Sequence, residues 1–346
     1  QSDNYTYNSS DSSDCFESSE SSESSEHVEN NTNPIQLSEK IKTIFSKVSV
    51  GCKKFLTNKV DRSVTGLIAQ QQCVGKFHTP LSNYGLISQS YFPNSDGVFS
   101  GCVTSVGEQP IVGIKDPLLM ANRSVSEGLL NLVWCLIDDL SNVRCSANWM
   151  WPMPNQDKKE GYRMFVVAQH LSKILSELNM AIDGGKDSLS MAVKDNDKLI
   201  KSPGSLVLTM YAKCPNIYKK VTPTIKRKTS ELYFVDLSDI IYNIQILKRC
   251  FEIIQKLISQ DKILSGHDIS DGGLITTIFE MCMASDLGCT ITLPQNINAL
   301  EFLTNESPGL VIEFKNPESI ELFREKNIKI YKVANVTNHE ELIIIQ

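Results

Sequence analysis

Two acidic segments that contain glycine pairs, far apart in the chain, carry side chains that could bind a phosphate and its metal. Residues 183–191 read DGGKDSLSM, and residues 266–274 read GHDISDGGL. Glycines let the backbone approach a ligand, N–H groups and a lysine can face phosphate oxygens, and carboxylates can hold Mg²⁺. Neither segment is a GxxxxGK[ST] or GxGxxG motif, so the common nucleotide-binding folds are not supported.

In the first segment, Lys186 follows Gly184 and Gly185 and could hold a phosphate, with Asp187 and Ser188 as metal or hydroxyl contacts. A β-turn that carries a surface lysine explains the same residues equally well. The segment alone therefore leaves both interpretations open.

The second segment places Asp268 and Ser270 on one side of an extended stretch, because side chains alternate there. Asp271 is expected to be the N-cap of a helix that begins at Gly272, which leaves Asp268 available as a ligand. His267 fits a buried, hydrogen-bonded histidine better than a general base. We therefore expect the ligand chemistry of this segment to come from Asp268.

Glu127 and Asn131 are four residues apart in a segment with helical spacing, so they project from one face. Both side chains offer oxygen ligands suited to Mg²⁺. A solvated polar face is the commoner explanation of such a pair. Here, however, apolar residues surround the pair, and polar groups inside an apolar helix need a partner.

Nothing in the chain resembles a Ser-His-Asp or Cys-His nucleophile arrangement, since Cys73 and Cys145 lack a base in a matching position. We therefore assign no catalytic residue. The ten cysteines include no CxxC pair, which argues against a zinc site. Because no export signal is recognisable, we expect free thiols and a cytoplasmic location.

The helices and strands that must position these residues are also indicated by the sequence. Asp116 is a good N-cap, and Pro117 fits the first position of a helix that runs to about Asp139. Further helices are expected at residues 36–48, 164–178, 244–258, 272–284 and 317–326. Strands are expected as two runs between 84 and 106 with a turn at 93–97, and at 206–212, 231–237, 289–293 and 309–314. Helices and strands mix without strict alternation, which predicts two α+β domains that meet near residues 215–230.

The composition divides the chain into four parts. Residues 1–34 are rich in serine and acidic residues and are expected to be disordered. Residues 35–218 form the first predicted domain, 219–230 a solvated basic linker, and 231–346 the second domain. Beyond the acidic tail, basic and acidic residues nearly balance, so we expect no nucleic-acid partner. No apolar run is long enough to span a bilayer, and because the chain begins with Gln we expect it to be part of a longer one.

Several stretches, in a fixed order, resemble the phosphoribosylformylglycinamidine synthase family of purine biosynthesis. Besides residues 183–191 and 266–274, these are 55–66 (FLTNKVDRSVTG), 70–75 (QQQCVG), 107–110 (GEQP), 145–151 (CSANWMW) and 202–206 (SPGSL). The resemblance covers residues 36–346, and motifs of this length are specific. Members of the family have an N-terminal domain, two tandem units similar to aminoimidazole ribonucleotide synthetase, and a C-terminal glutaminase. The chain resembles the second of the two units.

The resemblance implies an α+β unit made of an N-terminal and a C-terminal domain. It also implies ATP-dependent conversion of formylglycinamide ribonucleotide to formylglycinamidine ribonucleotide with glutamine as nitrogen donor. In that reaction ATP activates the amide oxygen, and ammonia displaces the phosphorylated group. Mg²⁺ and ATP or ADP are the implied cofactors, and the first synthetase-like unit and the glutaminase are the implied partners, with no membrane. The chain alone should not complete the reaction, because both partners are missing.

The resemblance also implies which residues form the site. The magnesium ligands are Glu127, Asn131, Asp268 and, after Thr79-Pro80-Leu81, Asn83. The nucleotide contacts are Lys53, Ser82, Ser270, Gly184, Gly185 and Lys186. The site of the family lies between the two synthetase-like units, so the chain would supply one wall.

The chain differs from the family pattern in three places, of which Asn83 and a missing glycine-rich stretch favour an alternative function. Asn83 stands where the family has Asp, Lys76 stands where it has Pro, and a glycine-rich stretch expected between Leu237 and Ile244 is missing, which shortens the second domain. Loss of a carboxylate should weaken magnesium binding. The alternative is a degenerate half that supports the synthase and binds nucleotide weakly or not at all. A stand-alone kinase or synthetase of the same fold, such as thiamine-monophosphate kinase or selenophosphate synthetase, is the third possibility, against which residues 70–75 and 145–151 speak.

Overall fold

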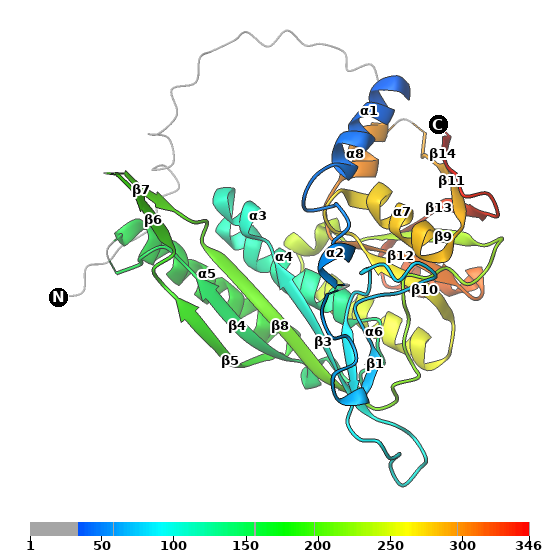
Figure 1. The fold of residues 1–346 in the computed structure, drawn as a ribbon, viewed down its shortest axis with the longest axis horizontal. Helices are drawn as coiled ribbons and strands as arrows, with labels where there is room; N and C mark the ends of the chain where they lie inside the picture. Colours follow the sequence, from blue (N-terminus) through cyan, green and yellow to red (C-terminus); the bar gives the residue numbers. More distant parts are fainter. Residues whose placement is uncertain (1–33, 58, 156, 197, 296, 346) are drawn as a thin grey trace.

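Two six-stranded sheets organise the part of the chain that the computed structural model describes, which is residues 34–345 without 58, 156, 197 and 296 (Figure 1). The predicted disordered segment 1–34 lies outside the described residues except for Pro34, which begins helix α1 (Pro34–Phe45). Strands and helices occur together in both halves of the chain, so the predicted α+β class is confirmed. Residues 215–230 connect the two sheets.

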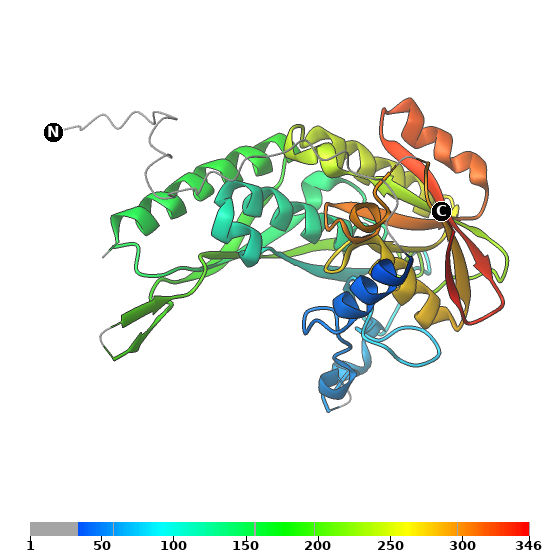
Figure 2. The same cartoon turned by 90° about the horizontal axis from the view of Figure 1, so that it is seen from above.

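The first sheet is covered by helices on one face only. Its strands, in spatial order, are β1 (Ile68–Gln70), β2 (Gly85–Ser88), β3 (Gly101–Glu108), β8 (Ser205–Cys214), β4 (Arg144–Met150) and β5 (Ala181–Ser188). The helices on its covered face are α4 (Pro117–Leu132) and α5 (Lys158–Leu178), with the short α3 (Pro110–Lys115) before α4 (Figure 2). Successive residues of β3 alternate between buried and exposed because only one side of this strand packs against α4.

The second sheet packs against its own set of helices. Its strands, in spatial order, are β10 (Ile263–Asp268), β12 (Gly309–Phe314), β9 (Glu231–Asp236), β13 (Lys329–Thr337), β11 (Gly288–Thr292) and β14 (Leu342–Ile345). The helices are α6 (Gln245–Ser259), α7 (Gly273–Ser285), α8 (Ala299–Thr304) and α9 (Glu321–Glu325). The helix α2 (Lys54–Thr57) and the hairpin of β6 (Ala192–Asp195) and β7 (Lys198–Lys201) complete the description, and the hairpin projects from the end of the first sheet (Figures 1 and 2).

A single hydrophobic cluster extends from the first sheet into the second. It contains Leu86 and Leu208 of the first sheet, Val235 and Leu310 of the second, and the buried side of α6. Gln255 of α6 strengthens this junction, because its amide nitrogen donates to the carbonyls of Val133 and Cys135 and its oxygen accepts from the N–H of Ile137. The two sheets are therefore joined by a continuous core.

Helix α4 begins as the sequence predicts. The Asp116 carboxylate accepts hydrogen bonds from the N–H groups of Leu118 and Leu119, and Pro117 occupies the first helical position. The helix ends at Leu132, earlier than the predicted Asp139. It ends there because the following residues pair with the connecting segment, where the N–H of Val221 donates to the carbonyl of Trp134.

Most other predicted elements are found near their expected positions. The exceptions have local causes. Helix α5 begins at Lys158 because the Asp157 side chain caps it there, and residues 317–326 divide into a 3-10 turn (Pro317–Ile320) and α9. Strands β1, β4, β5, β10, β13 and β14 were not predicted, and neither was the hairpin. A 3-10 turn (Ser238–Ile241) links β9 directly to α6, where the sequence lacks the expected glycine-rich stretch.

Helix α1 packs against the second sheet's helices, although residues 35–218 were predicted as one domain. Leu37 is buried in the cluster around α7, and Ile41 and Phe45 pack against it. The Phe45 ring stacks on Phe279 of α7, with 4.7 Å between ring centroids. The apolar face of α1 therefore packs against α7, a helix that comes much later in the sequence (Figure 1).

The connecting segment 219–230 is held in place, in contrast to the solvated linker that its basic residues suggest. Val221 and Ile225 are buried, and the carboxylate of Glu313, which is fully buried in β12, accepts hydrogen bonds from the N–H groups of Lys226 and Arg227. The same carboxylate accepts from the Ser265 hydroxyl of β10. Glu313 therefore fixes the segment to the second sheet.

Replacing Glu313 by alanine should lower the free energy of unfolding by about 3 kcal/mol, because three donors lose a charged acceptor in a buried position. Urea denaturation would measure the change. Glu313→Gln keeps one acceptor oxygen and should cost less, and Glu318→Ala, at an exposed position, should cost almost nothing. Equal stability of Glu313→Ala and Glu318→Ala would contradict the role assigned to Glu313.

Candidate functional site

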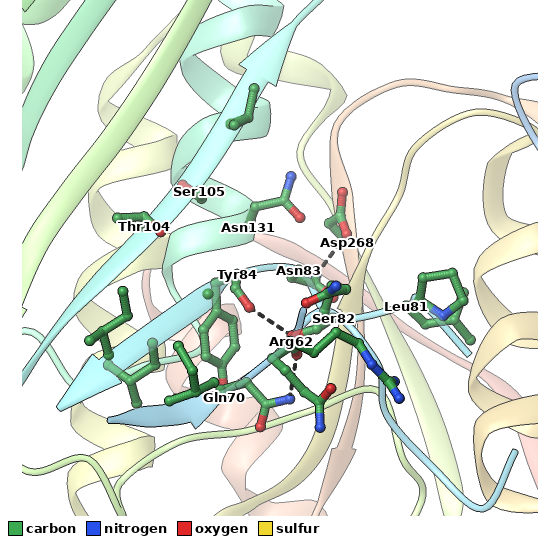
Figure 3. A pocket seen from close by; sticks show the side chains of 18 of the residues that line it. Arg62, Gln70, Leu81, Ser82, Asn83, Tyr84, Thr104, Ser105, Asn131 and Asp268 are labelled. Atoms are coloured by element: carbon green, nitrogen blue, oxygen red, sulfur yellow. Dashed lines mark hydrogen bonds between the residues drawn. The ribbon is translucent and has the colours of Figure 1, made fainter. Parts of the chain in front are cut away.

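A cavity of about 630 Å³ lies where the two sheets meet, and it brings the predicted metal ligands together (Figure 3). Glu127 and Asn131 reach it from α4, Asn83 from the segment before β2, and Asp268 from the end of β10. The predicted convergence of these four residues is therefore observed. Whether they bind a metal stays a prediction at this point.

Asp268 is buried and held from two sides. The amide nitrogen of Asn83 donates to Asp268 Oδ1 at 2.7 Å. The His267 ring lies 3.1 Å from Asp268 Oδ1 and 3.1 Å from Glu280 Oε2. Burial alone would lower the pKa of His267, but the two carboxylates raise it to about 9. His267 is thus the buried, hydrogen-bonded histidine that the sequence predicts, and it fixes both carboxylates.

Glu127 is a carboxylate without a cationic partner among the described residues. Its Oε2 accepts from the N–H of Glu108 at 2.8 Å and from the amide nitrogen of Gln109 at 3.0 Å. Burial raises the pKa of Glu127 to about 7 against these hydrogen bonds, and the charge of Asp268 adds to the shift. Two carboxylates facing one cavity favour a bound cation there, because it would offset the cost of their burial.

The amide side chains complete a set of oxygen donors. The nitrogen of Asn131 donates to the Glu127 carbonyl, which leaves the amide oxygen of Asn131 available. Asn83 Oδ1 is buried and accepts no hydrogen bond from the described residues. Within this part of the chain no three His, Cys, Asp or Glu side chains are grouped to hold a metal, so the amide oxygens are needed beside the carboxylates. An all-oxygen set of this kind fits Mg²⁺.

The predicted nucleotide contacts divide into three groups. Ser82 and Ser270 line the cavity. Lys53 lines a neighbouring pocket that shares Pro80, Leu81 and Glu280 with it, and its amino group donates to the carbonyls of Val48 and Ser49. The residues of segment 183–191 do not reach the cavity.

Gly184, Gly185 and Lys186 lie in β5, so the expectation of a turn or phosphate loop is wrong for their local structure. They form a strand because Gly185, with φ of 148°, packs against β4, where a Cβ would come within 2.0 Å of the Ala147 carbonyl oxygen. The Lys186 amino group donates to the Ser188 hydroxyl. Strands β4, β8 and β3 separate β5 from β2, so the nucleotide role of these residues is untested and stays a prediction.

The predicted N-cap of α7 is also wrong. The helix begins at Gly273, and Gly272 precedes it with a positive φ and no side-chain cap. The N–H of Gly272 donates instead to the carboxylate of Glu306. Glu306, which is distant in sequence, thus accepts the hydrogen bond at the start of the helix that was expected to go to Asp271.

Sequence reasoning missed several residues that line the cavity, among them Arg62, Gln70, Gln71 and Glu280. Arg62 and the two glutamines belong to the stretches 55–66 and 70–75, which served only as motifs of resemblance. These stretches are rich in polar residues and have little helical or strand periodicity. Polar loops of this kind often carry functional residues, so this feature could have identified them from the sequence.

None of the helices in the described part of the chain combines the length and the apolar character that crossing a membrane requires.

Two family models match the chain. The "FGAR-AT PurM_N-like domain" matches residues 52–213, and "AIR synthase related protein, C-terminal domain" matches residues 224–345. Together they include every residue of the cavity described above.

Curated relatives named phosphoribosylformylglycinamidine synthase match most of the chain. The relative from Dictyostelium discoideum is 38% identical over 87% of this chain and 24% of its own length. The relative from Drosophila melanogaster is 40% identical over 84% and 22%, and the human relative is 35% identical over 84% and 23%. The chain therefore spans about a quarter of the length of these relatives.

Solved structures share the fold at low sequence identity. "T. maritima PurL complexed with ADP" has a TM-score of 0.65 and 10% identity, and the match covers 89% of this chain and 49% of that one. A thiamine-monophosphate kinase from Stenotrophomonas maltophilia has a TM-score of 0.50 and 8% identity, over 72% of this chain and 89% of that one. The kinase shares the fold alone, whereas the curated synthases share the sequence over both halves. The chain therefore belongs to the phosphoribosylformylglycinamidine synthase family, of which it matches one synthetase-like half.

Proposed function

We propose that the chain is the second synthetase-like half of a phosphoribosylformylglycinamidine synthase and that its cavity forms one wall of a magnesium–nucleotide site. The observation that carries the proposal is the convergence of Glu127, Asn131, Asp268 and Asn83 in one cavity. Their order and chemical types match the ligand set that the family resemblance implies, with Asn83 as the one substitution.

In this proposal the oxygens of these four residues would hold Mg²⁺, and the hydroxyls of Ser82 and Ser270 would contact the nucleotide. Bound magnesium would neutralise charge on the phosphate groups. His267 would keep Asp268 oriented through their hydrogen bond. Solved structures of T. maritima PurL are described as complexes with ADP, ATP and FGAR, which supports ATP and formylglycinamide ribonucleotide as the substrates of the whole enzyme.

The uncovered face of the first sheet supports a partner for this half. Ile87 of β2 and Val106 of β3 are about half exposed, and every residue of β5 from Ala181 to Asp187 is exposed. A sheet face with apolar side chains in water is typical of an interface. We propose that the first synthetase-like half covers it and that the glutaminase joins the assembly. The cytoplasmic location stays a prediction.

The chain alone should form no formylglycinamidine ribonucleotide from ATP and formylglycinamide ribonucleotide, with either glutamine or ammonia. The reason is that the opposite wall of the site and the glutaminase are missing. A chromatographic product assay on the purified chain, with the complete enzyme as positive control, would measure this. Product above background from chain free of contaminating synthase would contradict the proposal.

Changing Asn83 to Asp should strengthen magnesium–ADP binding about tenfold, or about 1.4 kcal/mol, because it restores a carboxylate to the site. Without magnesium the same change should lower the melting temperature, because Asn83 now donates a hydrogen bond to Asp268 and two carboxylates would repel each other. Magnesium titration followed by melting curves, on the chain paired with its missing half, would measure both effects.

Asn316→Asp, at an exposed position far along the chain, makes the same charge change and serves as control. If Asn83→Asp responds to magnesium no more than this control, the degenerate scaffold is the better account of the chain.

A further inference from the structure

Glu280 connects the candidate metal site to α7, a helix that supplies none of the four proposed ligands. Its carboxylate oxygen Oε2 lies 3.1 Å from Nε2 of His267, and the other ring nitrogen, Nδ1, lies 3.1 Å from Asp268 Oδ1. The side chain of Glu280 is 19% exposed and lines both the cavity and the neighbouring pocket that contains Lys53. Glu280 and Asp268 therefore contact opposite ends of one imidazole ring.

The two carboxylate oxygens of Asp268 differ in what they contact. Oδ1 accepts a hydrogen bond from the amide nitrogen of Asn83 at 2.7 Å and lies against the His267 ring (Figure 3). Oδ2 accepts no hydrogen bond from the residues that the structure describes, although Asp268 lines the cavity. A carboxylate that binds a metal through one oxygen needs that oxygen free of other partners. Oδ2 is therefore the atom available to Mg²⁺, whereas Oδ1 anchors the side chain.

His267 can anchor Asp268 only if the ring itself is held. A histidine side chain rotates about two bonds, so a contact at one end does not fix the plane of the ring. Glu280 supplies the contact at the other end. Because the His267 side chain is only 8% exposed, water has little access to take the place of Glu280. The orientation of Asp268 thus depends on a residue of another element.

Helix α7 also holds the backbone of Asp268. Thr277 lies three residues before Glu280, on the same face of the helix, and its hydroxyl donates to the carbonyl of Asp268 at 3.0 Å. The adjacent residue Phe279 stacks on Phe45 of α1, which fixes the helix from its other side. Helix α7 is therefore a support that contacts Asp268 at both its main chain and, through His267, its carboxylate.

We propose that Glu280 is a positioning residue, which holds Asp268 through the His267 ring so that Oδ2 faces the bound metal. The inference rests on the magnesium–nucleotide site proposed above and adds a residue that acts on one of its ligands. Residues that orient a metal ligand typically change affinity 10- to 100-fold when they are replaced. The competing explanation is that the charge of Glu280 attracts the cation directly, and substitutions can separate the two.

Calorimetric titration with magnesium–ADP, on the chain paired with its missing half, would test the proposal. Glu280→Ala should weaken binding about tenfold, because His267 loses its second contact. Glu280→Gln removes the charge but keeps an oxygen that accepts from the ring, so it should retain most of the affinity. Adding Glu280→Ala to His267→Gln should cause little further loss, because the connection is already broken. Glu252→Ala, at an exposed glutamate of α6, makes the same change as a control and should bind normally.

A second measurement needs no ligand. In the metal-free chain, the nitrogen NMR signals of the His267 ring can be identified by their absence in His267→Gln. The Nε2 signal should shift in Glu280→Ala, where its acceptor is removed, and stay near its position in Glu280→Gln. An unchanged Nε2 signal in Glu280→Ala would show that the two residues do not interact in solution and would overturn the proposal.

The binding results separate the proposal from the function on which it rests. If the unchanged pair does not bind magnesium–ADP, the proposed site fails and the role of Glu280 fails with it. If the unchanged pair binds and Glu280→Ala binds equally well, only the role of Glu280 is refuted. Equal losses in Glu280→Gln and Glu280→Ala would indicate direct attraction by charge, and additive losses in the double variant would exclude action through His267.

A further variant decides the matter if circular dichroism shows that Glu280→Ala is unfolded. Glu280→Asp keeps the charge but draws the carboxylate back from the ring by one methylene group. A several-fold loss of magnesium–ADP affinity in this variant would support positioning, and unchanged affinity would exclude it.

Discussion

Replacing Asp268 by alanine is expected to weaken magnesium–ADP binding by more than about 100-fold, beyond the range typical of residues that only orient a metal ligand. Asp268 supplies a charged oxygen at the junction of the two sheets. It is also the residue that His267 and Asn83 hold in place, so no neighbouring carboxylate can replace it without breaking those contacts. Calorimetry with magnesium–ADP, on the chain paired with its missing half, would measure the loss.

Asp268→Asn separates the charge from the packing, because the side chain keeps its shape. It should lose most of the affinity, and the metal-free protein should melt at a somewhat lower temperature, because buried His267 loses the charge of one of its two carboxylate partners. Asp239→Ala, at a surface position that pairs with Lys329, is a control of the same residue type and should bind as the unchanged chain does. Full nucleotide binding by a folded Asp268→Ala variant would show that the family's ligand set does not operate here and would favour the scaffold.

Gly266→Ala is expected to lower the free energy of unfolding by about 3 kcal/mol and to remove magnesium–nucleotide binding with it. A Cβ at this position would lie 2.2 Å from the ring of Trp134, which is fully buried. Gly266 also donates its N–H to the carbonyl of Thr222 and lies two residues before Asp268 in β10. A shift of the strand that relieves the clash therefore moves the metal ligand.

Thermal and urea denaturation would measure the stability change, and calorimetry the binding. Gly184→Ala is the matched control for the stability measurement, since the nearest atom to its Cβ would be 3.8 Å away and the glycine has room for a methyl group. Adding Trp134→Leu to Gly266→Ala should restore part of the stability, because the smaller side chain vacates the space. If the single Gly266→Ala variant is as stable as Gly184→Ala, the contact with Trp134 does not require glycine at position 266 of β10.

The sequence predicted best the features that local chemistry determines. The start of α4 follows from the capping chemistry of Asp116 and Pro117, which needs no tertiary contact. Its end at Leu132 could not be predicted, because pairing with residues 219–221 stops the helix there, and those residues are distant in sequence. The packing of α1 against α7 could not be predicted for the same reason, since the apolar face of a helix does not identify the element that it packs against.

The site shows the same division. The spacing of the residues predicted that Glu127 and Asn131 share a helix face and that Asp268 and Ser270 share one side of an extended segment. Only the family resemblance indicated that the two pairs meet in one cavity. The glycines before Lys186 suggested a phosphate loop, although the reason for Gly185 is its contact with Ala147 on the adjacent strand. Arg62 escaped prediction because its segment has no regular periodicity and its buried nitrogen becomes evident only in three dimensions.

The shared core and the fixed segment 219–230 have a consequence for ligand binding. Glu313 ties the segment to the second sheet, Trp134 and Val221 tie it to the end of α4, and Gln255 joins α6 to the same turn. The wall formed by this half is therefore preorganised, because its shape is set when the chain folds. A ligand need not supply free energy to close the two domains of this half, so its affinity is not reduced by the population of an open state. If ligand binding changes the arrangement of domains, we expect the change in the orientation of this half relative to the half that faces it.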